Sequence, residues 1–174
     1  MRLLNVTQSY HPFLDKGGPT VKVRALARGM AGFGHQVTVL TADFGLDPDK
    51  KKAIGATPTR WGYEAKEDGV EAIYLRTRAQ YRSVTWNPGA AAFCRERLGG
   101  YDLTHIYGLY DLLGPRVASA CRRIARPYVV EPMGMFLPIV RSIWMKRLYH
   151  DTLGPNWRGR SPARRCRRWT RSSC

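Results

Sequence analysis

Along most of the chain, segments with two different spacings of apolar residues follow one another. Short runs rich in β-branched and aromatic residues predict strands, and runs with apolar residues three or four apart predict helices. The expected strands are RLLNVTQ (2–8), QVTVLTA (36–42), VEAIYLRT (70–77), YDLTHIYG (101–108) and RPYVVEPMG (126–134). The expected helices cover residues 19–33, 88–100, 111–125 and 137–153.

Strands that alternate with helices predict an α/β fold, a Rossmann-like parallel sheet with helices on both faces. Gly34 follows the first helix and is placed to end it in a left-handed cap. Residues 43–69 mix charge, Gly and Pro without a clear period. We therefore expect them to form an exposed excursion from the sheet.

The connection after the first strand contains Gly17, Gly18 and Pro19. Ligands of open parallel sheets lie beyond the carboxyl ends of the strands, where this connection falls. Glycine permits close approach, proline suits a first helical position, and a helix N-terminus attracts anions. The pair favours either a phosphate site or a tight turn that only starts a helix. The dinucleotide fingerprint G-x-G-x-x-G and the P-loop are both missing.

Length, composition and charge limit the number of domains, the location and the kinds of site that the sequence allows. A chain of 174 residues with 44% hydrophobic residues can bury a core and suits one domain. Its net charge is +16, and residues 155–174 hold seven Arg and no acid. No apolar run resembles a signal peptide or a membrane span, so we expect a cytoplasmic protein. The four cysteines show no CxxC spacing, so no zinc site is expected.

The segment YHPFLDKGGPTVKVRALARGMAGFGHQVTVLTA resembles the opening of family 4 glycosyltransferases. Two later segments, DLTHIYGLYDLLGPRVASACRR and PYVVEPMGMFLPIVRSIWMKRLYH, follow in the same order. The resemblance covers residues 1–153 and implies the amino-terminal, acceptor-side half of a GT-B architecture. It also implies that Gly17 and Gly18 approach the diphosphate of a nucleotide-sugar donor.

Other candidate residues follow the strands of the predicted sheet. His105 and Tyr107 alternate, so both should point to one face near a carboxyl end. They are candidates for acceptor or phosphate contacts, or for satisfied core residues. Tyr110 and Asp111 follow at the next turn, and Asp111 either contacts the acceptor or caps a helix.

The segment EPMGMF ends the last expected strand and retains the Gly-Met pair of the family, at Gly134. Glu131 is a candidate to orient an acceptor hydroxyl or to form a structural salt bridge. Arg141 and Lys146 are candidates for phosphate or acceptor contacts, or for a solvated helical face.

The resemblance implies sugar transfer from a nucleotide-sugar donor to an acceptor hydroxyl, without a metal or other cofactor. The family's donor-gripping domain with paired glutamates is not found in the sequence, so we expect a truncated chain that is inactive alone. Residues 154–174 are predicted to be a disordered basic tail or the product of a frameshift.

Two other functions compete with this interpretation. The positive charge suits a basic protein that binds nucleic acid or a membrane surface, with weak contacts to anionic lipid and a position on the inner face of the membrane. However, the body intersperses acids with bases and has no nucleic-acid motif, so no specific nucleic acid is expected. The missing dinucleotide fingerprint disfavours an intact nucleotide-binding domain. Asp43, just after the second expected strand, is either a candidate for a ribose contact or a solvated loop residue.

Overall fold

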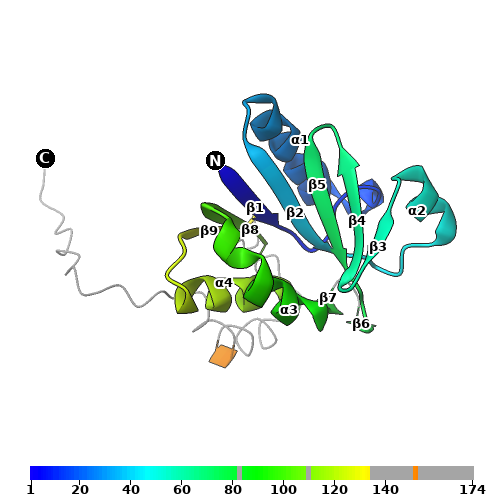
Figure 1. The fold of residues 1–174 in the computed structure, drawn as a ribbon. Coiled ribbons are helices and arrows are strands. Elements are labelled where there is room, and N and C mark those ends of the chain that lie inside the picture. Colours follow the sequence, from blue (N-terminus) through cyan, green and yellow to red (C-terminus); the bar gives the residue numbers. More distant parts are fainter. Residues whose placement is uncertain (82–83, 109–110, 134–150, 153–174) are drawn as a thin grey trace, which may run out of the picture.

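The computed structural model describes residues 1–81, 84–108, 111–133 and 151–152. A seven-stranded sheet has the order β3-β4-β5-β2-β1-β8-β9 (Figure 1). Strands β5, β2, β1, β8 and β9 run parallel, and β3 and β4 add an antiparallel edge. The main strands are β1 (Arg2–Val6), β2 (Gln36–Ala42), β4 (Gly62–Glu67), β5 (Val70–Leu75), β8 (Leu103–Tyr107) and β9 (Tyr128–Glu131).

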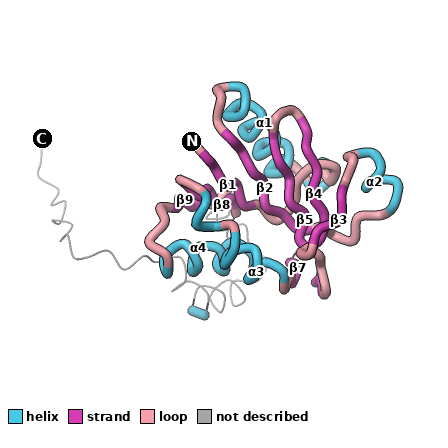
Figure 2. Tube along the Cα trace, in the orientation of Figure 1, coloured by secondary structure: helices cyan, strands magenta, loops and turns pink. Residues whose placement is uncertain are grey.

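Helices cover both faces of this sheet, as Figure 2 also shows. Helix α1 (Gly18–Gly32) packs on one face, and α3 (Gly89–Glu96) and α4 (Leu113–Arg123) pack on the other. Shorter elements are η1 (Leu14–Lys16), α2 (Pro48–Ala53), β3 (Thr57–Thr59), β6 (Ala79–Tyr81), β7 (Val84–Trp86) and η2 (Leu98–Gly100). The predicted α/β class and the mainly parallel sheet are confirmed.

Side-chain alternation along each strand divides the core into two layers. Leu4 and Val6 of β1 join the cluster beneath α3 and α4, whereas Leu3 joins Val23 and Ala27 of α1. Because β-strand side chains point alternately to opposite faces, one strand contributes to both layers. Along β8, successive side chains therefore pack alternately against α1 and against the layer of α3 and α4.

The prediction for residues 43–69 was wrong for β3 and β4, which join the sheet, whereas none of residues 47–60 is buried. This stretch contains α2, β3 and β4, and β4 pairs antiparallel with β5. Edge strands tend to be short and charged, so their alternation is weak in the sequence. Gly62 starts β4 with φ 154°, and a Cβ built there would lie 2.0 Å from the Tyr74 carbonyl oxygen. The close pairing of the two strands therefore requires glycine.

The boundaries of the parallel core match the sequence closely. Strand β2 covers the expected residues 36–42, and Gly34 adopts φ 83° after α1, which confirms the left-handed cap. The hairpin of β6 and β7 was not predicted. The helix expected over 137–153 lies outside the described residues apart from residues 151–152.

Candidate functional site

The connection between β1 and α1 lies at the carboxyl edge of the parallel strands. β1 ends at Val6, and α1 begins at Gly18 after the short helix η1. The two strands beside β1 in the sheet are β2 and β8. Both run parallel to β1, so all three strands end at the same edge of the sheet. The paired glycine therefore occupies the edge at which open α/β sheets bind ligands.

Gly17 and Gly18 serve different purposes in this connection. Gly17 has φ 110° and ψ −174°, a region that is essentially restricted to glycine. Its carbonyl oxygen accepts the amide of Thr20 at 3.2 Å. No described atom lies within 4 Å of a Cβ built on Gly18, so the space over Gly18 is open.

The start of α1 carries the positive end of the helix dipole. No acidic residue stands in its first turn, and no side chain among the described residues caps it. Ser9 Oγ and the buried Thr20 Oγ1 lie 2.7 Å apart and fix the loop against the helix. This end of α1 can therefore receive an anion over Gly18 without displacing a carboxylate of its own.

His105 and Tyr107 lie on the α1 face of β8, which confirms that both side chains share one face. Their rings stack with centroids 4.0 Å apart and planes 28° apart. Tyr107 is buried, and His105 is partly exposed. The imidazole therefore reaches the rim, whereas the phenol ring contributes to the core.

Glu131 joins this pair from the end of β9. Its Oε2 lies 3.3 Å from His105 Nε2, and its Oε1 forms an ion pair with Lys22 Nζ. This contact does not meet strict hydrogen-bond geometry, but it is close enough for Glu131 to act on the His105 pKa. The salt-bridge alternative for Glu131 is thus present in the structure, and acceptor contact stays a prediction.

Burial and nearby charges together favour the neutral form of the His105 imidazole. Burial lowers its pKa from the usual value, Lys22 lowers it further, and Glu131 opposes both effects. Burial, together with the Glu131 charge, raises the pKa of Tyr107 to about 12. The cluster of Lys22, Glu131 and His105 therefore combines an ion pair with a neutral ring.

Asp111 lies in the turn between β8 and α4. Its Oδ1 accepts the Gly114 amide at 2.6 Å, which confirms the helix-capping alternative. Burial raises its pKa to about 6 against the effect of the backbone amides of Gly114 and Leu113. A contact between Asp111 and an acceptor stays a prediction.

Several candidates cannot be placed in this site. Tyr110, Gly134, Arg141 and Lys146 lie outside the described residues. Among the described residues, Lys22 is the site residue that sequence reasoning missed. Its position one helical turn after Gly18 was the available signal, because residues four apart share a helix face.

A buried polar network supports the carboxyl edge beside this cluster. Asp43 Oδ1 accepts the amides of Gly45 at 3.2 Å and Thr77 at 2.9 Å. Asp43 is buried, so its interpretation as a solvated loop residue was wrong. Asn87 donates to Thr77 Oγ1 at 3.1 Å and to the Leu75 carbonyl at 3.1 Å, which ties the start of α3 to the end of β5.

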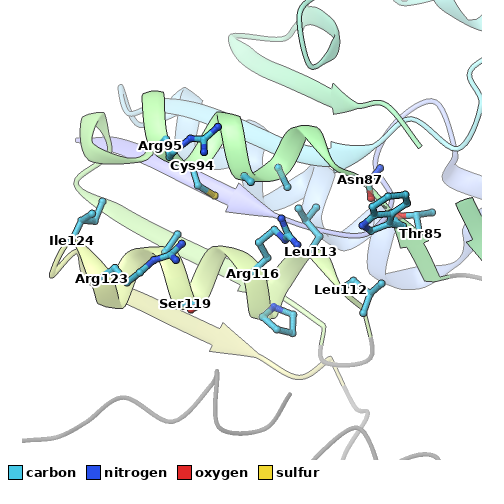
Figure 3. A pocket seen from close by; sticks show the side chains of 15 residues that line it. Thr85, Asn87, Cys94, Arg95, Leu112, Leu113, Arg116, Ser119, Arg123 and Ile124 are labelled. Carbon is cyan, nitrogen blue, oxygen red and sulfur yellow. Dashed lines mark hydrogen bonds between the residues drawn. The ribbon is translucent and has the colours of Figure 1, made fainter. Parts of the chain in front are cut away.

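A groove of about 760 Å³ runs between α3 and α4 (Figure 3). Thr85 and Leu112 lie at one end, and the side chains of Arg95, Arg116 and Arg123 lie along its length. Cys94 lines the groove as a free thiol, and burial raises its pKa to about 12. The groove was not predicted, because its two walls are distant in sequence.

Metal ligands and membrane spans were both sought in the described part of the chain. There, no group of three or more His, Cys, Asp or Glu residues is arranged to hold a metal ion. Within the same residues, no helix is long and apolar enough to cross a membrane.

One known protein family matches most of the chain. Residues 17–173 match the glycosyl transferase 4-like domain. The chain belongs to this family. The match begins at Gly17, and it confirms the resemblance to family 4 glycosyltransferases and the Rossmann-like half of a GT-B architecture. A glycosyltransferase domain implies a sugar donor and an acceptor as substrates. No curated protein matches the chain.

Proposed function

We propose that this domain binds the diphosphate of a nucleotide-sugar donor over Gly17 and Gly18 and an acceptor hydroxyl beside His105. The observation that carries the proposal is the open, glycine-lined start of α1 at the carboxyl edge of the sheet. The side chains of Glu131 and His105 lie at the same edge and are both partly exposed, which supports a place for the acceptor beside them. The domain thus presents surfaces to both substrates.

The chemistry of sugar transfer makes the start of α1 the important contact. The bond between the anomeric carbon and the donor diphosphate breaks, a bond to the acceptor oxygen forms, and the proton of the acceptor hydroxyl passes to the leaving diphosphate or to water. Negative charge grows on the leaving diphosphate, and preorganised dipoles stabilise it best. Exposed helix ends contribute about 0.3–1 kcal/mol to such an anion. We propose a reaction without a metal, in which these dipoles and side-chain cations neutralise the diphosphate.

We also propose that efficient transfer requires a second, donor-gripping domain with paired glutamates, so that residues 1–174 alone have little activity. Support comes from the candidate site, whose described residues face the diphosphate and the acceptor but include no group assigned to the nucleoside. The described residues supply the start of α1 and the acceptor-facing cluster, but a donor also has a nucleoside that must be held. Addition of such a domain should therefore raise transfer by this chain.

A second candidate function rests on charge. Residues 155–174 carry seven Arg and no acid, which supports weak, salt-dependent contact with anionic lipid or another polyanion. A place in the cytoplasm, or peripherally on the inner membrane face, agrees with that charge. This contact would accompany sugar transfer rather than replace it.

The proposed function is tested with Gly18→Val, because a side chain there would fill the space left for the diphosphate. Binding of nucleotide sugars with different bases is followed by ligand-detected NMR. Wild type should bind at least one of them, and Gly18→Val should abolish that binding while circular dichroism stays native. Pro19→Ala is the matched control and should bind normally, since alanine suits the first helical turn and obstructs nothing.

Normal binding by Gly18→Val would remove the phosphate role and leave the paired glycine as a turn. Lack of binding to every nucleotide sugar tested, in folded wild type, would contradict the proposed function itself.

A further inference from the structure

Lys22 stands between the two substrate-facing parts of the site. It is the fifth residue of α1, and its Nζ pairs with Glu131 at the end of β9. Residues four apart lie on the same helix face, so Lys22 shares a face with Gly18. Helix side chains tend to lean toward the N-terminus, so a Lys22 side chain released from Glu131 would be able to reach toward the open space over Gly18.

The ion pair of Lys22 is placed where it can change partners. The Lys22 side chain is 52% exposed and flexible, whereas Glu131 is 29% exposed at the strand end. An exposed ion pair contributes only about 0.2–1 kcal/mol, so a more highly charged anion competes well for the ammonium group. A diphosphate over Gly18 would be such an anion.

Glu131 has a second partner at hand when Lys22 leaves. Its Oε2 already lies 3.3 Å from His105 Nε2, but the alignment falls short of a hydrogen bond. Within the part of the chain that the structure describes, the charged groups that act on this imidazole are Lys22 from α1 and Glu131 from β9, and the Tyr107 ring stacks on it from its own strand. Loss of the Lys22 contact would allow the carboxylate to turn fully to His105.

We propose that Lys22 is a shared cation: an anion bound over Gly18 draws Lys22 from Glu131, and Glu131 then takes His105 as its partner. This inference rests on the proposed function, because the anion in question is the donor diphosphate. It adds that donor binding prepares the acceptor side of the same site. Lys22 touches Glu131 rather than His105 and influences the imidazole through its charge and through Glu131, so it is a positioning residue there.

Competition between Glu131 and the anion gives a direct test with inorganic pyrophosphate. Affinities are measured by titration calorimetry on the full chain for wild type, Lys22→Met, Glu131→Gln and the double variant. Lys22→Met should weaken binding about fivefold, and Glu131→Gln should strengthen it because Lys22 is released. In the Lys22→Met background, Glu131→Gln should lose most of its effect.

Two control variants distinguish this coupling from the effect of net charge on pyrophosphate affinity. Lys52→Met on the exposed surface of α2 removes the same charge and should leave the affinity unchanged. Lys22→Arg keeps the charge and should retain most of the affinity. Equal effects of Glu131→Gln in the presence and absence of Lys22 would overturn the shared cation, since through-space repulsion alone acts in both backgrounds.

The His105 pKa supplies a readout that a purely structural role would not move. In the free chain, Lys22→Met should raise this pKa, and Glu131→Gln should lower it, as followed by NMR of the ring nitrogens. Saturating pyrophosphate should raise the wild-type pKa more than that of Lys22→Met. Equal shifts in both proteins would overturn the coupling.

These outcomes distinguish the coupling from the proposed function. Pyrophosphate binding that Gly18→Val abolishes but Lys22→Met leaves unchanged would overturn the coupling alone. Absence of pyrophosphate binding in wild type would overturn both.

Discussion

Ser9 Oγ lies 2.7 Å from Thr20 Oγ1, and this hydrogen bond ties the exit of β1 to the first turn of α1. Thr20 is fully buried and Ser9 is partly buried, so the contact is partly protected from water. It holds the loop that contains Gly17 and Gly18 in one position relative to the sheet. The candidate phosphate site is therefore built before any ligand arrives.

Removal of this contact should destabilise the domain. Ser9→Ala and Thr20→Val should each lower the free energy of unfolding by about 1–3 kcal/mol, because each leaves a hydroxyl without its partner or a gap in its place. Urea denaturation measures the loss. The double variant should lose less than the sum of the single losses, and additive losses would show that the two hydroxyls act independently.

The two adjacent glycines should respond differently to alanine. Gly17→Ala should lower the free energy of unfolding by about 1–3 kcal/mol, since only glycine adopts its backbone conformation without strain. Gly18→Ala should be neutral or slightly stabilising, because the added Cβ meets no described atom. Thermal denaturation compares the two variants. Equal destabilisation would contradict the division of roles between them.

Asp111 should make the domain less stable as pH rises. Its folded pKa is raised from 3.8 to about 6, so its contribution to stability is full below pH 3.8 and is lost as pH rises through about 6. The loss amounts to about 3 kcal/mol. Asp111→Asn keeps an oxygen for the Gly114 amide and cannot ionise.

Chemical denaturation of both proteins between pH 4 and pH 7 isolates this effect from other titrating groups. Wild type should lose about 2 kcal/mol more than Asp111→Asn over this range, because part of the full loss has already occurred at pH 4. Identical pH profiles would show that the pKa of Asp111 is not raised by folding, and would contradict this prediction.

Polyanion binding should come from residues 155–174. Replacement of their seven arginines by glutamine should remove most binding to anionic vesicles or to duplex DNA, and added salt should weaken wild-type binding steeply. Co-sedimentation and fluorescence anisotropy measure the two cases. Selective binding to one DNA sequence that survives the replacement would favour a nucleic-acid function over sugar transfer.

The sequence predicted those parts of the molecule that depend on local periods. The β-branched run 36–42 became β2, and strict alternation placed His105 and Tyr107 on one face. Gly17 and Gly18 were located at the correct edge because strand exits of a parallel sheet share that edge. Their phosphate role follows from the family resemblance and stays a prediction.

Features that depend on distant pairs were missed. Lys22 meets Glu131 across 109 positions, and no local pattern links them. Strand β4 escaped notice because its charged residues hide its alternation, although Gly62 marks its close pairing with Tyr74. The groove between α3 and α4 also joins two separate segments. Such features arise from packing rather than from propensity.

The central claim is that the donor diphosphate lies over the start of α1. Amide chemical shifts of the isotopically labelled full chain, recorded during titration with the nucleotide sugar that binds best, test it most directly. We predict that Gly17, Gly18 and Thr20 show the largest shifts, and that Gly18→Val abolishes them in a folded protein. Shifts that instead map to the groove between α3 and α4, or that persist unchanged in Gly18→Val, would contradict the account.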